Sequence, residues 1–331
     1  MNCHLKYCLS LLLFLSISQA HAQQTAQYSQ YLDNYYLVNP AATNIQNNLQ
    51  LHMGFRHYWT DFEGSPKTIY LSAYAPLTKP GEDQHMRSAM RLTDRLDTSD
   101  LSARGSAKSN HIAGLILSQD DIGLFSKTTA HLTYSFHLPL TESLSVSVSP
   151  KLGWVHLGLN EDLRVLEEND QPFLEFMNNH QQRGMFDLGF GLWLYSDKLF
   201  FGYSLEQLVK NTAFSSEQVN GVEFEPHHYV MAGYRFRVSP RLKLVPNLLV
   251  RYVEANLTST DYSLRAEYGS RLWASFSFRQ QNAMVALVGM SISNQLSFSY
   301  SFDHSNDIAL QNRINAHEIS LRINVLPNLH K

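Results

Sequence analysis

Cysteine is scarce in this chain of 331 residues, which has only Cys3 and Cys8. Both lie in a leading segment with the three parts of a secretory signal: a positive charge at Lys6, an apolar stretch over 9–17 and a small-x-small cleavage site at 20–22. Cleavage there removes both thiols. We therefore expect an exported mature chain without disulfide or thiol chemistry, although export leads to compartments that permit disulfides.

Long apolar runs are also missing. After residue 17 nothing approaches the roughly 18 uninterrupted apolar residues of a transmembrane helix. A strand of an outer-membrane barrel needs only about 9–11 residues and gives a weak hydropathy signal. A mean hydropathy of -0.25 is therefore no argument against a membrane location.

Neither a strong charge imbalance nor a catalytic motif is present. The formal net charge is -3 without a basic stretch, which disfavours nucleic-acid binding. No G-x-S-x-G elbow occurs, and Leu321 stands where an H-E-x-x-H zinc motif beginning at His317-Glu318 needs its second histidine. His227 and His228 would point apart on a strand and so would not easily share a metal ion. We expect neither an enzyme nor a metal or cofactor site.

What the chain has instead is an alternation of apolar and hydroxyl side chains that recurs from residue 49 to residue 325. Residues 143–149 read Ser-Leu-Ser-Val-Ser-Val-Ser, and residues 296–302 read Leu-Ser-Phe-Ser-Tyr-Ser-Phe. Successive side chains on a strand point to opposite faces, so each run has one apolar and one hydroxyl face. In an exported chain this predicts an all-β transmembrane barrel in the bacterial outer membrane. A soluble β-sandwich or propeller is the alternative, although no blade-like repeat is apparent.

The alternation and the turn signals together predict about fourteen antiparallel strands. Their expected ranges are 49–59, 67–75, 110–118, 125–138, 143–157, 184–195, 198–208, 227–238, 242–254, 261–269, 271–279, 283–291, 295–303 and 316–325. The connections mostly alternate between short and long, as periplasmic turns and outer loops do in such barrels. The long, charged connection 76–109 breaks this rule because it falls on the periplasmic side.

The sequence thus divides into four expected parts. These are a signal peptide at 1–22, an N-terminal periplasmic segment at 23–48, the barrel at 49–325 and a C-terminal tail at 326–331. The N-terminal segment could plug the lumen, contact a periplasmic partner or pack against the barrel wall for stability.

Short motifs occur at three separated places in the mature chain. Tyr-Ser-Gln-Tyr at 28–31 precedes Asn-Pro-Ala at 39–41, and Phe-Arg-His-Tyr-Trp at 55–59 precedes Gly-Ser-Pro-Lys-Thr at 64–68. Ser-Tyr-Ser-Phe-Asp at 299–303 precedes Ala-His-Glu-Ile-Ser-Leu at 316–321. In order and separation these resemble the opening, first hairpin and closing strands of the PorP/SprF family of the Bacteroidetes envelope.

The resemblance implies a component of the type IX secretion and gliding-motility apparatus. Such a barrel associates with periplasmic and outer-membrane machinery proteins, and it docks or helps export secreted surface proteins such as adhesins. The motif positions carried over as structural or partner-binding residues are Ser29, Gln30, Tyr31, Asn39, Pro40, Arg56, Trp59, Gly64, Pro66, His317 and Glu318.

Alternation also assigns faces within the first strand. Arg56 and Trp59 are three residues apart, so Trp59 suits an aromatic girdle while Arg56 faces the lumen. There Arg56 would either select anions or pair with a lumenal carboxylate. The competing function is a passive porin or small-solute transporter, with Arg56, His137 and Arg279 as candidate lining residues. An outer-membrane hydrolase would need a nucleophile and a base that converge near one rim.

Overall fold

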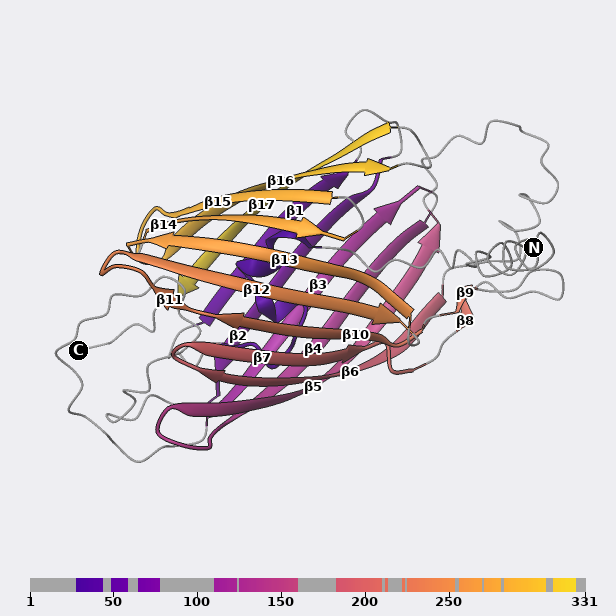
Figure 1. Cartoon of the computed structure of the whole chain (residues 1–331). Helices are drawn as coiled ribbons and strands as arrows, with labels where there is room; N and C mark the ends of the chain where they lie inside the picture. The colour runs from indigo at the N-terminus through magenta and orange to yellow at the C-terminus, as the bar shows by residue number, and fades with distance from the viewer. Residues whose placement is uncertain are drawn as a thin grey trace, which may run out of the picture.

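In the computed structural model the chain forms a closed barrel of fourteen antiparallel strands (Figure 1). The structure describes residues 28–43, 49–58, 65–77, 110–123, 125–159, 183–209, 212–213, 222–223, 225–253, 256–269, 271–280, 283–307 and 312–325. The barrel strands are β1 (Leu49–Tyr58), β2 (Lys67–Pro76), β3 (Asn110–Ile122), β4 (Phe125–Pro139), β5 (Leu144–Leu159), β6 (Arg183–Ser196), β7 (Leu199–Glu206), β10 (His227–Tyr234), β12 (Leu242–Val253), β13 (Asn256–Tyr268), β14 (Leu272–Arg279), β15 (Ala283–Ser291), β16 (Leu296–Asp307) and β17 (Asn312–Val325).

Three short strands complete the described sheets. β11 (Phe236–Arg237) follows β10 after an interruption at Arg235 and pairs with β12. β8 (Thr212–Ala213) and β9 (Val222–Glu223) form a separate two-stranded sheet. The helices of the described chain are two 3-10 turns, and neither is long or apolar enough to cross a membrane.

The ring closes where the first strand meets the last. β1 pairs with β17 from Leu49 opposite Val325 to Tyr58 opposite Ala316, and this β1–β17 junction is called the seam below. On the far side β10 pairs with both β7 and β12. Each of the fourteen strands therefore has two neighbours, which satisfies the backbone within the ring as a lipid environment requires.

The two faces of the wall differ as the alternation predicts. On β14, the outward Phe276 is 55% exposed, whereas the inward Ser275 and Ser277 are buried. The same division holds on β4, where the outward Leu132 is exposed and the inward Ser135 is buried. The apolar face thus forms the outer surface and the hydroxyl face lines the lumen.

The connections distinguish two ends of the barrel. Those around 140–143, 197–198, 238–241 and 292–295 are short and define the turn end, and the opposite end is called the loop end. The β2–β3 connection leaves from the turn end, where the Leu77 N–H donates to the His111 carbonyl at 2.8 Å. Most of the predicted 76–109 insertion lies outside the described residues, as do the signal peptide and the C-terminal tail.

The expected count of fourteen strands is confirmed, but several strands are longer than predicted at the loop end. β3 continues to Ile122 rather than 118, and β13 begins at Asn256 rather than 261. β16 continues to Asp307 and β17 begins at Asn312. Residues 304–307 are polar without exception, so the alternation stops there while the backbone ladder continues. In such a polar stretch the side-chain pattern no longer marks a strand.

Candidate functional site: a lumenal segment, a charged seam and a cavity

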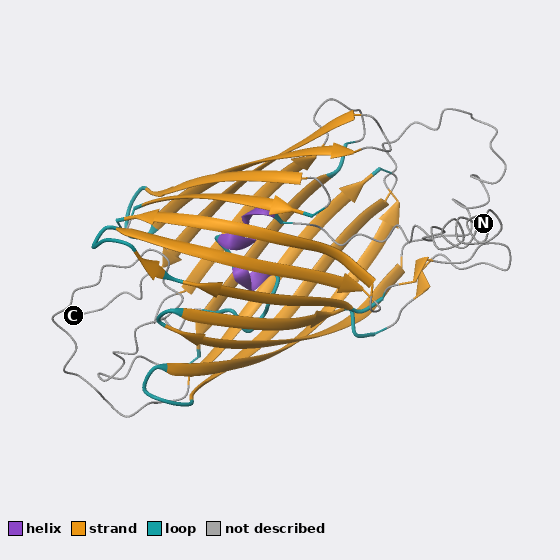
Figure 2. Ribbon diagram, in the orientation of Figure 1, coloured by secondary structure: helices purple, strands orange, loops and turns teal. Residues whose placement is uncertain are grey.

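Residues 28–43, called the lumenal segment, lie inside the barrel and contain both short helices, η1 (Ser29–Leu32) and η2 (Tyr35–Leu37) (Figure 2). Every residue from 29 to 43 is buried. The Asn39 N–H donates to the Tyr35 carbonyl at 2.9 Å, and Asn39 Oδ1 accepts the Ala41 N–H at 3.0 Å. This turn crosses Pro40, which has no N–H to satisfy. The segment is therefore compact rather than extended.

Three tyrosines of this segment bridge its apolar and polar surroundings. The Tyr35 ring lies 5.6 Å from Trp193 and 5.3 Å from Phe200, centroid to centroid. Each hydroxyl then reaches a polar side chain of the lumenal wall. The bonds are Tyr31 to Ser263 at 2.9 Å, Tyr35 to Asn247 at 2.7 Å and Tyr36 to Thr133 at 2.6 Å. An apolar ring with a polar tip suits a lumen whose wall carries both apolar and polar side chains.

A buried charge cluster joins the segment to the seam. Arg56 on β1 lies opposite Glu318 on β17, and its Nη1 donates to Glu318 Oε2 at 2.8 Å. Its Nη2 donates to Asp303 Oδ2 on β16 at 2.6 Å. The Ser29 N–H donates to Glu318 Oε2 at 2.8 Å, and Ser29 Oγ contacts both Asp303 and Arg56. Tyr70 donates to the other Glu318 oxygen at 2.9 Å.

Gln30 fastens the same region through its side-chain amide. Its Nε2 donates to the Glu318 carbonyl at 2.8 Å and to the Ser299 carbonyl at 3.3 Å. Its Oε1 accepts the hydroxyls of Ser299 at 2.5 Å and Ser320 at 2.6 Å. The amide thus uses both donors and both acceptor sites on β16 and β17.

The seam cluster continues around the lumen as a series of alternating charges. Arg279 on β14 lies 4.0 Å from Asp303 and donates from Nε to Asp261 at 3.0 Å. Arg251 on β12 also donates to Asp261, at 2.9 and 3.0 Å. From Glu318 to Arg251 each buried charge therefore has an opposite charge beside it, which is the condition for burying ions without a large penalty.

A second ionic contact holds the middle of the segment. Asp33 contacts Arg265 and accepts the Trp273 indole N–H at 3.1 Å. Burial by itself would raise the pKa of Asp33, but the positive charges of Arg265 and Arg322 outweigh it and hold the pKa below its usual value. Asp33 therefore stays ionised inside the lumen at neutral pH.

These contacts span most of the wall. The segment bonds to ten of the fourteen strands, namely β1, β2, β4, β6, β7, β12, β13, β14, β16 and β17. Ser29 lies beside Arg56, close to the loop end of β1, while the Thr43 hydroxyl meets His137 at 2.7 Å near the turn end of β4. The segment thus passes along the lumen from the loop half toward the turn end.

The other motif positions fall at separate places. Asn39 Nδ2 donates to the Leu192 and Tyr203 carbonyls at 3.0 and 3.2 Å, and the Pro40 carbonyl accepts from Ser135 at 2.9 Å. The Pro66 carbonyl accepts the Tyr58 N–H at 2.9 Å in the first hairpin. Trp59 and Gly64 lie outside the described residues.

Several histidines singled out by the sequence lie on different faces. His317 is on the outer face, where its Nδ1 meets the Tyr300 hydroxyl at 2.7 Å. His227 is buried toward the lumen, whereas His228 stacks on the outward Tyr252 ring at 4.6 Å. His137 is lumenal and bonds to Tyr195 as well as Thr43. Among the described residues no group of three or more His, Cys, Asp or Glu is placed to hold a metal ion.

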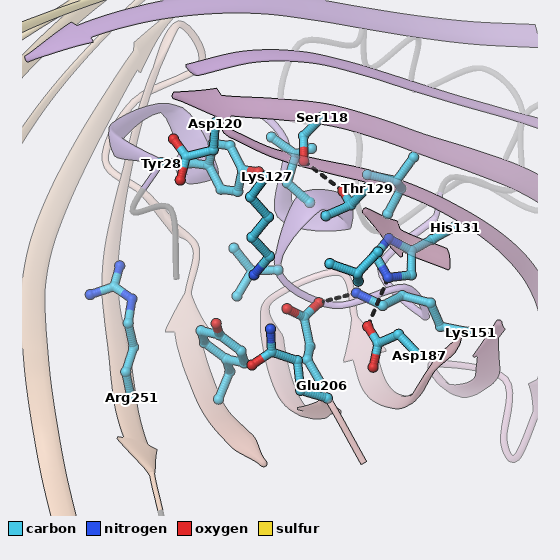
Figure 3. Close-up of a pocket in the computed structure, with 16 residues that line it drawn as sticks. Tyr28, Ser118, Asp120, Lys127, Thr129, His131, Lys151, Asp187, Glu206 and Arg251 are labelled. Atoms are coloured by element: carbon cyan, nitrogen blue, oxygen red, sulfur yellow. Dashed lines mark hydrogen bonds and ion pairs between the residues drawn. The ribbon is translucent and has the colours of Figure 1, made fainter. Parts of the chain in front are cut away.

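A cavity of about 70 Å³ lies beside Tyr28 in the loop half of the lumen (Figure 3). Its wall carries an ion pair between Lys151 and Glu206 and a 2.8 Å bond between His131 Nε2 and Asp187. Figure 3 shows the side chain of Lys127 extending toward Glu206 from the opposite side. A cavity of this size holds several water molecules. Acidic and basic groups therefore line a space that the lumenal segment leaves unfilled.

A comparison with known families decides what kind of barrel this is. The profile of the type IX secretion system membrane protein family PorP/SprF matches residues 20–323. The chain belongs to the PorP/SprF family. As a PorP/SprF protein with a β-barrel fold it is located in the outer membrane and belongs to the type IX secretion proteins. No curated protein matches the chain.

Solved structures similar to this PorP/SprF protein are known. It is similar to the CymD monoaromatic hydrocarbon channel, with 13% identity, 92% of this chain and 94% of that chain covered, and a TM-score of 0.51. A Pseudomonas aeruginosa FadL homologue has 9% identity, coverages of 87% and 92%, and a TM-score of 0.48. The Pseudomonas putida toluene transporter TodX has 11% identity, coverages of 91% and 94%, and a TM-score of 0.44. At these identities the likeness to CymD shows the barrel fold alone.

Proposed function

We propose that this PorP/SprF protein is a filled outer-membrane anchor that works by binding other proteins and does not act as an enzyme. Its turn end would meet periplasmic and outer-membrane parts of the type IX secretion machinery. Its loop end would meet secreted, adhesin-like surface proteins and hold them for export or attachment. Membership in the family supports the link to the machinery, and the remainder is our inference.

The observation that carries the proposal is the filling of the lumen. Residues 29–43 are buried and bond to ten strands through hydrogen bonds and the ion pair between Asp33 and Arg265. A solute could pass this region only after the segment moved, which would break the ion pair of Asp33 with Arg265 and the hydrogen bonds of Ser29 to Glu318 and Asp303. Separating a buried ion pair costs several kcal/mol. A fixed barrel that presents two different ends therefore suits docking better than conduction.

A pull-down from an outer-membrane extract with the tagged full chain tests this function. We expect to recover a type IX component and a large secreted surface protein. Recovery of neither would contradict the proposal.

Matched variants then separate the two ends. Asp187→Asn/Glu206→Gln changes the cavity at the loop end and should reduce recovery of the surface protein. Arg237→Gln/Arg241→Gln changes exposed residues at the turn end and should reduce recovery of the machinery component. Equal losses in both variants would contradict a division of labour between the ends.

The porin alternative predicts a steady open-pore current in a planar bilayer. Its three candidate lining residues all lie in the lumen, but each is engaged: Arg56 with Glu318 and Asp303, Arg279 with Asp261, and His137 with Thr43. We expect the reconstituted wild-type barrel to show no steady current. A persistent current would favour the passive channel over the anchor.

A further inference from the structure

The lipid-facing surface beside the seam carries three basic side chains in one row. In the strand register His57 on β1 lies opposite Lys67 on β2 and opposite His317 on β17. Side chains in such positions have Cβ atoms about 4.5–5.5 Å apart. All three point outward, because the residues next to them at 56, 68 and 318 are buried in the lumen.

The row lies at the edge of the apolar belt. Two residues nearer the middle of the barrel, the same strands place Phe55, Ile69 and Ile319 side by side, and these are 42%, 56% and 46% exposed. In the other direction β1 ends at Tyr58, one residue beyond the row. The row therefore lies at the level where the hydrocarbon core of the membrane ends and the lipid headgroups begin.

Hydroxyl groups fix both histidine rings. Ser65 Oγ lies 2.7 Å from His57 Nε2, and Tyr300 Oη lies 2.7 Å from His317 Nδ1. When the hydroxyl donates to one ring nitrogen, the proton of a neutral imidazole resides on the other. The two rings and the exposed Lys67 ammonium then offer three donors at one level of the outer surface.

Within the described part of the chain, one acidic group faces this row. Asp121 on β3 lies opposite Lys67 in the register. It accepts the Ser126 hydroxyl at 2.6 Å and the Gln119 amide at 3.3 Å. Asp121 therefore has hydrogen-bond partners other than Lys67. His57 and His317 lie on the far side of Lys67 from Asp121.

We propose that Lys67, His57 and His317 bind the phosphate of a lipid headgroup in the outer leaflet. A phosphate accepts charge-assisted hydrogen bonds from ammonium and imidazole groups, and basic side chains at the interface attract anionic headgroups. The strand connections at the turn end other than β2–β3 are short, as on the periplasmic side of outer-membrane barrels, which assigns the loop end to the cell surface. The occupant is a lipid because its acyl chains would lie on the apolar row directly beside the donors.

The test compares phosphorylated and dephosphorylated lipid A. The full chain in detergent micelles is incubated with bisphosphorylated lipid A, with dephosphorylated lipid A or with inorganic phosphate, and bound lipid is counted by native mass spectrometry. Wild type should retain the phosphorylated form at least about fivefold better, the gain expected of one basic side chain near a membrane surface. His57→Gln/Lys67→Gln should lose that preference.

A matched control removes the same residue types at the opposite end. His111 is outward and Lys198 is exposed, both at the turn end, so His111→Gln/Lys198→Gln should keep the preference. Heat-dependent gel mobility confirms that each variant forms a barrel. If the test pair fails to fold, Lys67→Gln alone carries the test, since its side chain is exposed.

Three results would overturn the proposal. Equal retention of both lipid A forms by wild type would remove the role of the phosphate. An unchanged preference in the folded test variant would remove the role of the row. Displacement of the lipid by an equal concentration of inorganic phosphate would assign the row to a free anion instead of a lipid.

Discussion

Two regions of the lumen contain similar charged side chains, but one region is filled by the lumenal segment and the other borders open space. At the seam, the carboxylates of Asp303 and Glu318 meet Arg56, and the lumenal segment supplies the remaining bonds. At the cavity, Lys151 pairs with Glu206, and open space remains beside the pair. The Glu206 side chain is 15% exposed, whereas that of Glu318 is fully buried. Charged side chains in a lumen therefore do not by themselves indicate a pore, because the lumenal segment can supply the remaining hydrogen bonds to these charges.

The largest effect should come from breaking the seam. Arg56→Ala leaves Glu318 buried without its cation and leaves Asp303 only Arg279, at 4.0 Å, so we expect a loss of about 3–5 kcal/mol in the free energy of unfolding. Urea unfolding in detergent micelles, followed by tryptophan fluorescence, measures the loss. Lys151→Ala at the cavity is the control and should cost about 1–3 kcal/mol, since water can reach Glu206. Equal costs would mean that the two regions do not differ energetically.

A smaller effect should follow the removal of the charge on Asp33. Asp33→Asn weakens the contact with Arg265 and should cost about 1–3 kcal/mol at neutral pH. Because the folded-state pKa of Asp33 lies below the unfolded value, its ionised form stabilises the fold above that value. The difference between wild type and variant should therefore shrink as the pH falls below 3.8 and through the lower folded-state pKa. A difference that persists unchanged in acid would contradict the ionic role.

The smallest effect should come from Gln207, which contrasts with another buried glutamine, Gln30. Gln207 lines the cavity with a φ of 55° and a buried Oε1 that lacks a hydrogen-bond partner. Glycine adopts this conformation without strain, so Gln207→Gly should stabilise the fold by about 1 kcal/mol. Gln30→Ala should destabilise it, because four bonds at the seam disappear. Thermal unfolding of both variants measures these changes in stability. A destabilised Gln207→Gly would show that the Gln207 side chain stabilises the fold.

Much of the fold could be predicted because a barrel wall imposes its alternation on the sequence. Each spanning strand has lipid on one side and the polar lumen on the other, as 296–302 shows. The loop-end extensions of β13, β16 and β17 could not be predicted from it, because no apolar face is required there. Only the backbone pairing in the structure shows that they are strands, for example the pairing of Asp307 with Asn312.

The candidate site was predictable in part. Motif resemblance singled out Ser29, Gln30, Arg56 and Glu318, which the structure brings together at the seam. Their contacts could not be predicted, because they depend on the register between strands at opposite ends of the chain. The cavity residues were missed altogether. Lys151, Asp187 and Glu206 are isolated polar positions on three strands, and each reads alone as an ordinary inward residue.

The bonds of Ser29 and Gln30 also concern the order in which the barrel assembles. These residues precede every strand in the chain, yet their partners Glu318 and Ser320 belong to the last strand, and Ser29 is 289 residues from Glu318. Contacts between such distant residues form slowly, because a long loop must close before they contribute. Arg56 on the first strand lies opposite Glu318 on the last strand, and both residues bond to Ser29. The seam that closes the ring is therefore also the site that holds the start of the lumenal segment.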